Sequence, residues 1–196
     1  MLLSSKMVLP ALVALAGMSL IGLSLGCSEA VPPANQGAVS AQFITSSAVG
    51  TPGSCSIASH PFQIGVTHPS DTGQIIFLRD GEAQAQIFCS VVPEGNSWNI
   101  AAEMEEGPRS FKVTVNGLSP SSTQAEPALG SVTYRSVETI DFFTSTEDFP
   151  CTFWITDQQE VNDGRVWAQY SCPLLQSKQR DCALGESTIA LQNCDS

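Results

Sequence analysis

Hydrophobic and polar residues alternate with a period of two through most of the chain after residue 54. In the clearest run, 109–116, Phe111, Val113 and Val115 share one face and polar side chains share the other. Such alternation indicates a strand with one buried face and one face in water. Similar runs occupy 62–67, 74–79, 83–91, 98–104, 131–137, 151–156, 166–172 and 188–194.

Residues that favour tight turns separate many of these runs. They are Asp80-Gly81, Glu94-Gly95-Asn96, Glu106-Gly107-Pro108 and Asn162-Asp163-Gly164. No stretch of the body keeps the apolar spacing of a helix over three turns. Eight or nine short strands joined in this way predict an all-β fold, an antiparallel sandwich or open barrel, as a single domain over 54–196.

The first 26 residues are typical of an export signal. Lys6 is their only charged residue, and 7–25 is apolar or small. A cationic start followed by an apolar run is the pattern of a secretory signal peptide. An uncleaved transmembrane helix is the alternative, because the run is almost long enough to span a bilayer. Pro10, Gly17 and Gly22 weaken such a helix, and no cationic stop-transfer cluster follows.

The end of this signal, Leu23-Ser24-Leu25-Gly26-Cys27, resembles the lipobox of bacterial lipoproteins, although Ser24 stands where Leu is usual. The resemblance implies that Cys27 becomes the new amino terminus and carries thioether-linked diacylglycerol, a role that suits the nucleophilic sulfur. Ser28 follows the cysteine where Asp would resemble an inner-membrane retention signal. The implied location is the bacterial cell envelope, anchored by lipid to a membrane, with the outer membrane favoured.

Cysteine parity supports the same interpretation. The chain has seven cysteines, and lipid on Cys27 leaves an even number. An exported chain meets an oxidising compartment, so the remaining six predict up to three disulfides. An exported chain with an unlipidated Cys27 would retain a free thiol. The six cysteines expected in disulfides are Cys55, Cys89, Cys151, Cys172, Cys182 and Cys194.

Strand parity narrows the disulfide pairing without deciding it. A hairpin around 162–164 places Cys151 opposite Cys172 and Phe153 opposite Tyr170, where a cross-strand bond is possible. Six cysteines allow fifteen connectivities. Sequential pairing (55–89, 151–172 and 182–194) is the first choice, and a Cys172–Cys194 bond is the rival, because both residues end strand-like runs.

Residues 27–53 are expected to form the lipidated amino terminus and a flexible linker. From residue 28 the segment is rich in Ala, Ser, Gly and Pro, nearly free of charge, and without a sustained period. This composition is typical of a flexible tether. A partner-binding segment around Phe43-Ile44 is the alternative interpretation of the same stretch.

The charge balance argues against several function classes. Eight basic residues stand against 19 acidic ones, for a net charge of -11. Such a chain offers no basic stripe for nucleic acid and no electrostatic dock for anionic lipid. It also has no phosphate-binding loop, dinucleotide fingerprint or C-x-x-C pair. We therefore expect no catalytic residues, no cofactor, no metal and no nucleic-acid partner.

Two other function classes stay open as alternatives. His68, Ser70 and Asp71 are the residue types of an exported hydrolase, although neighbours in sequence form a triad only if the fold brings them into register. The acidic loop 157–163 is the candidate for a calcium-stabilised adhesion module, although its spacing differs from the calcium-loop pattern. A solvated hairpin tip explains the same loop.

Trp154 and Trp167 form the best candidate ligand surface in the sequence. By alternation both lie on the polar face of the predicted hairpin. Two aromatic rings on a wet sheet face suit a carbohydrate or a peptide. The favoured alternative is that another strand, or the loop 138–149, covers this face.

The body also resembles, in broad outline, small β-rich bacterial lipoproteins of the lipoprotein-antigen type. The similarity lies in the lipobox, the low-complexity tether and strands such as Ile87-Phe-Cys89 and Gln169-Tyr-Ser-Cys172. It implies a disulfide-linked sheet and assigns no ligand. The sequence as a whole predicts a lipid-anchored, non-enzymatic envelope protein with a binding or structural role.

Overall fold

The computed structural model describes residues 32–45, 55–67, 74–178 and 180–196. The chain divides into two units, Met1–Pro32 and Pro33–Ser196, and the second is the folded domain. The signal segment 1–26 and Cys27 lie outside the described residues. Within the described ranges, no helix has the length and apolar character needed to cross a membrane.

The domain is all-β and antiparallel, as predicted, and its strands form one twelve-stranded sheet. Several strands are only two or three residues long, too short for alternation to reveal. A 3-10 turn, Glu82–Gln84, precedes β4. The strands are β1 (Gln36–Ile44), β2 (His60–Ile64), β3 (Leu78–Arg79), β4 (Ala85–Glu94), β5 (Ser97–Glu106), β6 (Arg109–Leu118), β7 (Ala128–Arg135), β8 (Phe143–Thr144), β9 (Cys151–Trp154), β10 (Glu160–Asn162), β11 (Arg165–Ser177) and β12 (Arg180–Gln192).

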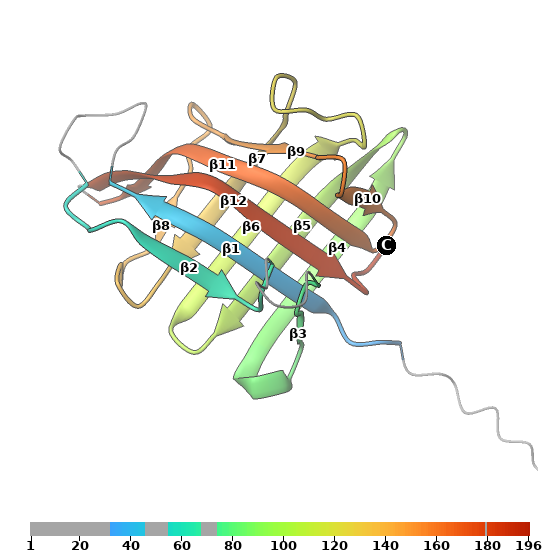
Figure 1. The fold of residues 1–196 in the computed structure, drawn as a ribbon, viewed down its shortest axis with the longest axis horizontal. Coiled ribbons are helices and arrows are strands. Elements are labelled where there is room, and N and C mark those ends of the chain that lie inside the picture. Colours follow the sequence, from blue (N-terminus) through green and yellow to red (C-terminus); the bar gives the residue numbers. More distant parts are fainter. Residues whose placement is uncertain (1–31, 46–54, 68–73, 179) are drawn as a thin grey trace, which may run out of the picture. The chain divides into compact units, whose positions relative to one another are not determined.

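The sheet folds back on itself into two facing layers. Its order is β2-β1-β12-β11-β8-β7-β6-β5-β4, and β9 pairs with both β11 and β7. Figure 1 shows β1, β2, β11 and β12 in front of β4–β7, with the two sets of strands crossing at a large angle. Such crossing is one of the two common ways in which sheets pack. Strands β8 and β9 join the layers along one side.

On the side opposite β8 and β9, the carboxyl-terminal residues pair with the edge of β4. The backbone N–H of Val91 in β4 donates to the carbonyl of Asp195 over 2.8 Å, and the N–H of Asp195 donates to the carbonyl of Cys89 over 3.0 Å. A Cys89–Cys194 disulfide lies beside these bonds. The exposed edge of β4 is therefore partly covered, which limits edge-to-edge association.

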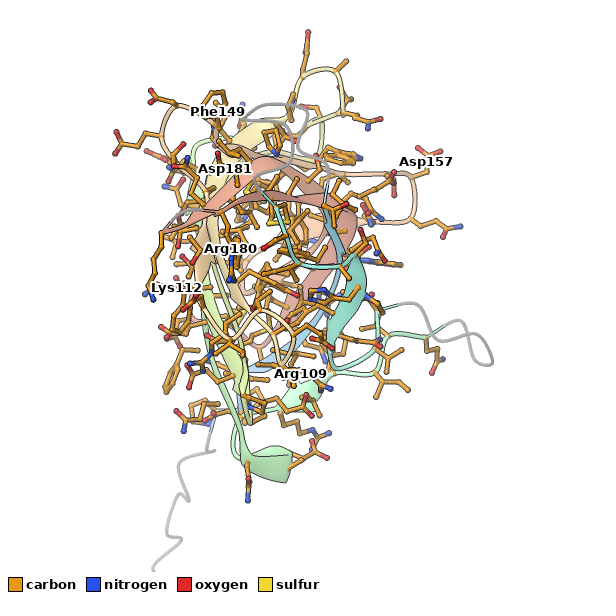
Figure 2. The ribbon with its side chains drawn as sticks, turned by 90° about the vertical axis from the view of Figure 1, so that its left-hand side faces the viewer. Arg109, Lys112, Phe149, Asp157, Arg180 and Asp181 are labelled. Atoms are coloured by element: carbon orange, nitrogen blue, oxygen red, sulfur yellow. A yellow bond between two sulfur atoms is a disulfide. The ribbon has the colours of Figure 1, made fainter. Side chains whose placement is uncertain are left out.

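Side chains fill the space between the layers (Figure 2), and the largest fully buried ones include Tyr134, Tyr170 and four phenylalanines. Phe62 in β2 lies edge-on to Tyr134 in β7, with ring centroids 4.7 Å apart, and Phe153 stacks on Tyr170 at 5.5 Å. Phe111 in turn contacts Tyr170 at 5.6 Å. These rings join both layers into one hydrophobic core, where buried aromatic pairs add to the stabilisation from burial.

The expectation of a flexible linker over 27–53 is wrong for residues 36–44. These residues form β1, which lies between β2 and β12. Val39 pairs with Ile189 of β12 and with Ile64 of β2, and the side chain of Val39 is fully buried. Phe43 is buried in the core as well, which removes the alternative that Phe43-Ile44 is an exposed partner-binding segment. The domain therefore begins upstream of residue 54.

The six cysteines form three disulfides, of which one was correctly paired from the sequence. Cys151 bonds to Cys172, and Phe153 lies opposite Tyr170 as the predicted register requires. The other bonds are Cys55–Cys182 and Cys89–Cys194. The structure therefore contradicts the sequential pairs 55–89 and 182–194 and the rival pair 172–194. The two observed long-range bonds join elements that become neighbours only when the sheet folds, so local strand parity could not predict them.

The burial of both tyrosines predicts that the free energy of unfolding falls at alkaline pH. Burial is the main cause that raises the pKa of Tyr134 and of Tyr170 above the ordinary value of 10.0. A tyrosine whose pKa is raised by folding contributes to stability at pH values below its unfolded-state pKa. This contribution is lost as the pH rises above the unfolded-state pKa, because the unfolded chain then ionises more readily than the folded one. Above about pH 10, we expect the free energy of unfolding to fall by about 1.4 kcal/mol per pH unit for each tyrosine.

Urea unfolding at a series of alkaline pH values measures this slope, and Tyr170→Phe should halve it. Because the chain contains only these two tyrosines, phenolate absorbance reports on both directly. Phenolate that formed near pH 10 while the far-ultraviolet circular dichroism stayed native would contradict the expectation.

Candidate functional site

The outer face of β4–β7 carries side chains in regular rows across the strands. Alternation directs every second residue away from the core, and the registers align these residues from strand to strand. One row holds only small side chains: Ser90 pairs with Ala101, Ala101 with Thr114, and Thr114 with Ser131. Thr114 and Ser131 also share a hydrogen bond of 2.6 Å between their hydroxyls.

Larger side chains stand on both sides of this small row. The first flanking row is Phe88, Glu103, Lys112 and Thr133. The second contains the pairs Val92 with Asn99, and Asn116 with Leu129. The small row therefore forms the floor of a shallow groove that crosses four strands. We call this feature the outer groove and define it by its floor residues, Ser90, Ala101, Thr114 and Ser131.

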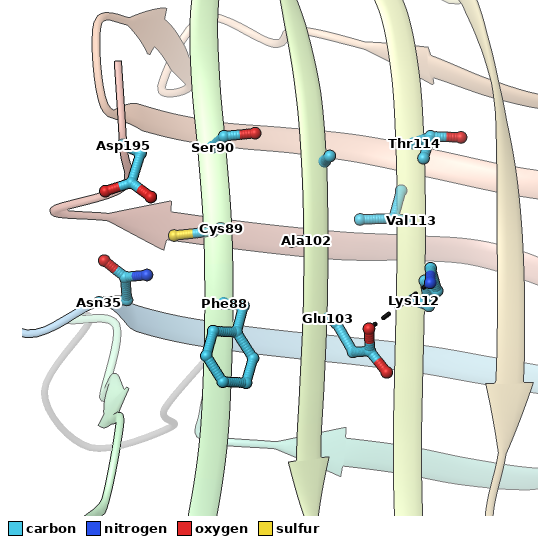
Figure 3. A pocket seen from close by; sticks show the side chains of 11 residues that line it. Asn35, Phe88, Cys89, Ser90, Ala102, Glu103, Lys112, Val113, Thr114 and Asp195 are labelled. Atoms are coloured by element: carbon cyan, nitrogen blue, oxygen red, sulfur yellow. Dashed lines mark ion pairs between the residues drawn. The ribbon is translucent and has the colours of Figure 1, made fainter.

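Two depressions lie along the outer groove and share Thr114. The first, of about 320 Å³, lies over β4–β6 and reaches Asn35 and Asp195 at the edge of β4. The second, of about 400 Å³, extends over β7 to Glu147 and Pro150. Figure 3 shows the first depression, with Phe88, Glu103 and Lys112 in one row and Ser90 and Thr114 in the next.

Phe88 is the most exposed aromatic side chain of the groove wall. Its relative exposure is 60%, although it lies in the middle of a long strand. Beside it, the Lys112 ammonium lies 3.5 Å from the Glu103 carboxylate, and both side chains are about half exposed. A pair of this kind contributes little to stability. The wall of the groove thus combines a solvent-exposed aromatic ring with solvent-accessible polar groups.

The surface predicted around Trp154 and Trp167 is not an open platform. Both residues lie on the same face, since Trp154 pairs with Gln169, two residues from Trp167. However, Trp154 is only 5% exposed, so its ring offers no surface for a ligand. Trp167 is half-buried, and within the described part of the chain its indole nitrogen is buried without a hydrogen-bond partner.

A buried histidine network links β2 to the segment after β7. The His60 Nδ1 lies 2.9 Å from the carbonyl of Ala58, so this nitrogen carries the proton and donates it. Nε2 then accepts from the hydroxyl of Tyr134 at 2.8 Å and lies 3.0 Å from the hydroxyl oxygen of Ser136. Glu138 approaches the same Nε2 at 3.7 Å.

This network resembles a hydrolase triad in composition but not in geometry. A triad has its nucleophile and its acid on opposite nitrogens of the histidine, whereas Ser136 and Glu138 share one. Ser136 is also buried, at 3% exposure. The pKa of the Glu138 carboxyl is lowered mainly by a hydrogen bond from the backbone of Glu138 itself and secondly by one from the Ser136 side chain. The arrangement satisfies the polar groups of a buried histidine, and it was not anticipated from the sequence.

Two other sites were predicted from the sequence, a hydrolase site and an acidic loop. His68, Ser70 and Asp71 lie outside the described residues, so the hydrolase hypothesis stays a prediction. In the acidic loop 157–163, Glu160 pairs with Arg165 at 2.9 Å, and Asp163 accepts a hydrogen bond from the Trp98 indole at 3.0 Å. Within the described ranges, no three His, Cys, Asp or Glu side chains are grouped to hold a metal ion.

Comparison with known proteins gives no family for this chain: no protein family, no curated protein and no solved structure matches it.

Proposed function

We propose that the chain is a lipid-anchored binding protein of the bacterial cell envelope, without catalytic activity, and that it contacts its ligand through the outer groove. The observation that carries the binding role is the groove itself, an open depression beside an exposed Phe88. Concave surfaces that combine apolar and polar groups are the usual sites of ligand binding.

Cysteine use supports the lipid anchor. Three disulfides use six of the seven cysteines, which leaves only Cys27 outside them. Long-lived disulfides are typical of exported proteins. In such a protein, a single remaining cysteine at the end of a lipobox-like segment has a role as the site of lipid attachment.

The anchor predicts a complete loss of membrane association in Cys27→Ala. The full chain, expressed in a diderm bacterium, should enter the detergent-rich phase on Triton X-114 partition and incorporate a labelled fatty acid. The variant should enter the aqueous phase without label, because acyl chains supply the membrane affinity. Ser28→Ala, next to the same site, is the matched control and should behave as wild type. A Cys27→Ala protein that stayed in the detergent-rich phase would instead favour the uncleaved transmembrane helix.

A further inference from the structure

We propose that the ligand of the outer groove is an extended, uncharged glycan chain, with one sugar ring stacked on Phe88. This inference rests on the proposed binding role and names the class of ligand. It follows from the chemistry of the groove lining, from the direction of the groove across the sheet, and from its length.

The lining suits a ligand that is rich in hydroxyl groups and carries no charge. Its floor offers the hydroxyls of Ser90, Thr114 and Ser131, which both donate and accept hydrogen bonds. The charged groups that line the two depressions are Lys112 and three acids, Glu103, Glu147 and Asp195. With acids in excess, the groove disfavours a polyanion.

Phe88 supplies the apolar part of the site. The C–H faces of a sugar ring are apolar, while its edges carry hydroxyls, so a sugar can cover an aromatic ring and still bond to polar neighbours. Phe88 is 60% exposed, and Ser90 follows it on the same face of β4. Glu103 lies directly opposite Phe88 on β5. An aromatic platform next to a hydroxyl and a carboxylate therefore suits one sugar unit.

The direction of the groove distinguishes a glycan from a peptide. An extended peptide usually binds by adding to the edge of a sheet, where free backbone groups pair with it. The outer groove crosses β4–β7 over their face, and the backbone groups there are paired within the sheet. A ligand on this face meets side chains only. Four adjacent strands span about 14 Å, which matches about three linked sugar rings.

Binding of uncharged oligosaccharides to the full, detergent-solubilised chain tests the proposal. The probes are linear oligomers of N-acetylglucosamine and of glucose, two to six sugars long, followed by isothermal titration. We expect binding of at least one series, with affinity that rises up to about three or four sugars and then levels off. Absence of measurable binding by both series would overturn the proposed ligand class.

Two groove variants and one control make the site assignment specific. Phe88→Ala removes the platform, and Ala101→Leu fills the floor; each should weaken binding by about tenfold or more. Both positions are exposed, so the urea midpoint should not change. Phe142→Ala removes a comparably exposed phenylalanine outside the groove lining and should bind like wild type. Equal affinities of wild type and Ala101→Leu would overturn the site.

The ligand class and the binding role fail in different ways. A photo-reactive phenylalanine analogue in place of Phe88, activated in intact cells, reports what touches the groove. A cross-link to a polypeptide, with no oligosaccharide binding, would overturn the glycan and retain a binding role. No cross-link and no oligosaccharide binding together would overturn both. A cross-link to polysaccharide, with saturable oligosaccharide binding, is the expected result.

Discussion

Replacing Cys89 and Cys194 by alanine is expected to lower the free energy of unfolding by about 5 kcal/mol, because a disulfide mainly restricts the unfolded chain. The two residues are 105 apart in the sequence, and the chain-entropy relation gives about 4.8 kcal/mol for a loop of that length. A typical domain has only about 5–15 kcal/mol in total. The variant should therefore be marginally folded, with a sharply reduced urea midpoint.

The Cys151–Cys172 bond provides the matched control. It closes a loop of only 21 residues, for which the same relation gives about 3.3 kcal/mol. The double alanine variant of this pair should thus lose about 1.5 kcal/mol less than the Cys89–Cys194 variant. Urea unfolding at neutral pH measures both, and peptide mapping of the unreduced wild type checks the pairing. A larger loss for the short loop would contradict loop-closure entropy as the cause.

Gly130→Ala is expected to cost about 3 kcal/mol or more, as overpacking of a well-packed site does. Gly130 lies in β7 between two partners, Val115 of β6 and Cys151 of β9. An added Cβ would overlap the carbonyl oxygen of Thr114 and lie 2.8 Å from a ring carbon of Phe153. Because one obstacle is backbone and the other is a buried ring, neither can move without disturbing the sheet.

Gly185→Ala is the control for this substitution. Gly185 also lies in a strand, β12, but its nearest neighbour would be 3.6 Å from the added Cβ, an ordinary contact. We expect a change within about 0.5 kcal/mol, measured by the same urea unfolding. Similar losses for both variants would show that the cost comes from replacing a strand glycine in general and not from steric overlap at Gly130.

Strand β1 shows why part of the fold was missed from the sequence. Its inward residues include Gly37 and Ala41 alongside Val39 and Phe43, so alternation is present but most of the contrast in hydrophobicity is lost. The facing layer approaches closely at Gly37, since an added Cβ would meet the Met104 sulfur at 2.6 Å and the Met104 side chain would have to shift. A composition that is typical of a linker therefore also occurs in a buried strand.

The first part of strand β12 was missed because its residues are hydrophobic on both faces. Alternation predicted a strand at 188–194, whereas β12 spans Arg180–Gln192. In the part that was missed, the consecutive residues Cys182, Ala183 and Leu184 are all buried, so both faces of the strand are covered there and the hydrophobic pattern becomes continuous. A strand that is buried on both faces does not alternate in hydrophobicity.

The outer groove illustrates the same division of information. Alternation alone placed Lys112 and Thr114 on the wet face of 109–116, and both line the first depression. The alignment of Ser90, Ala101, Thr114 and Ser131 in one row depends on the registers of three strand pairs. A shift of one residue in any pair would turn that strand's groove residues toward the core.

The sequence by itself determined the all-β class and the faces of the main strands, and it favoured the Cys151–Cys172 pair, because alternation and hairpin register are local properties of the chain. Only the tertiary structure decided that 36–44 joins the sheet, that Cys55 meets Cys182 and Cys89 meets Cys194, and that Trp154 is buried. These features depend on which strands become neighbours when the sheet folds into two layers. That choice is made by burial and packing between residues more than a hundred positions apart, and no local pattern records it.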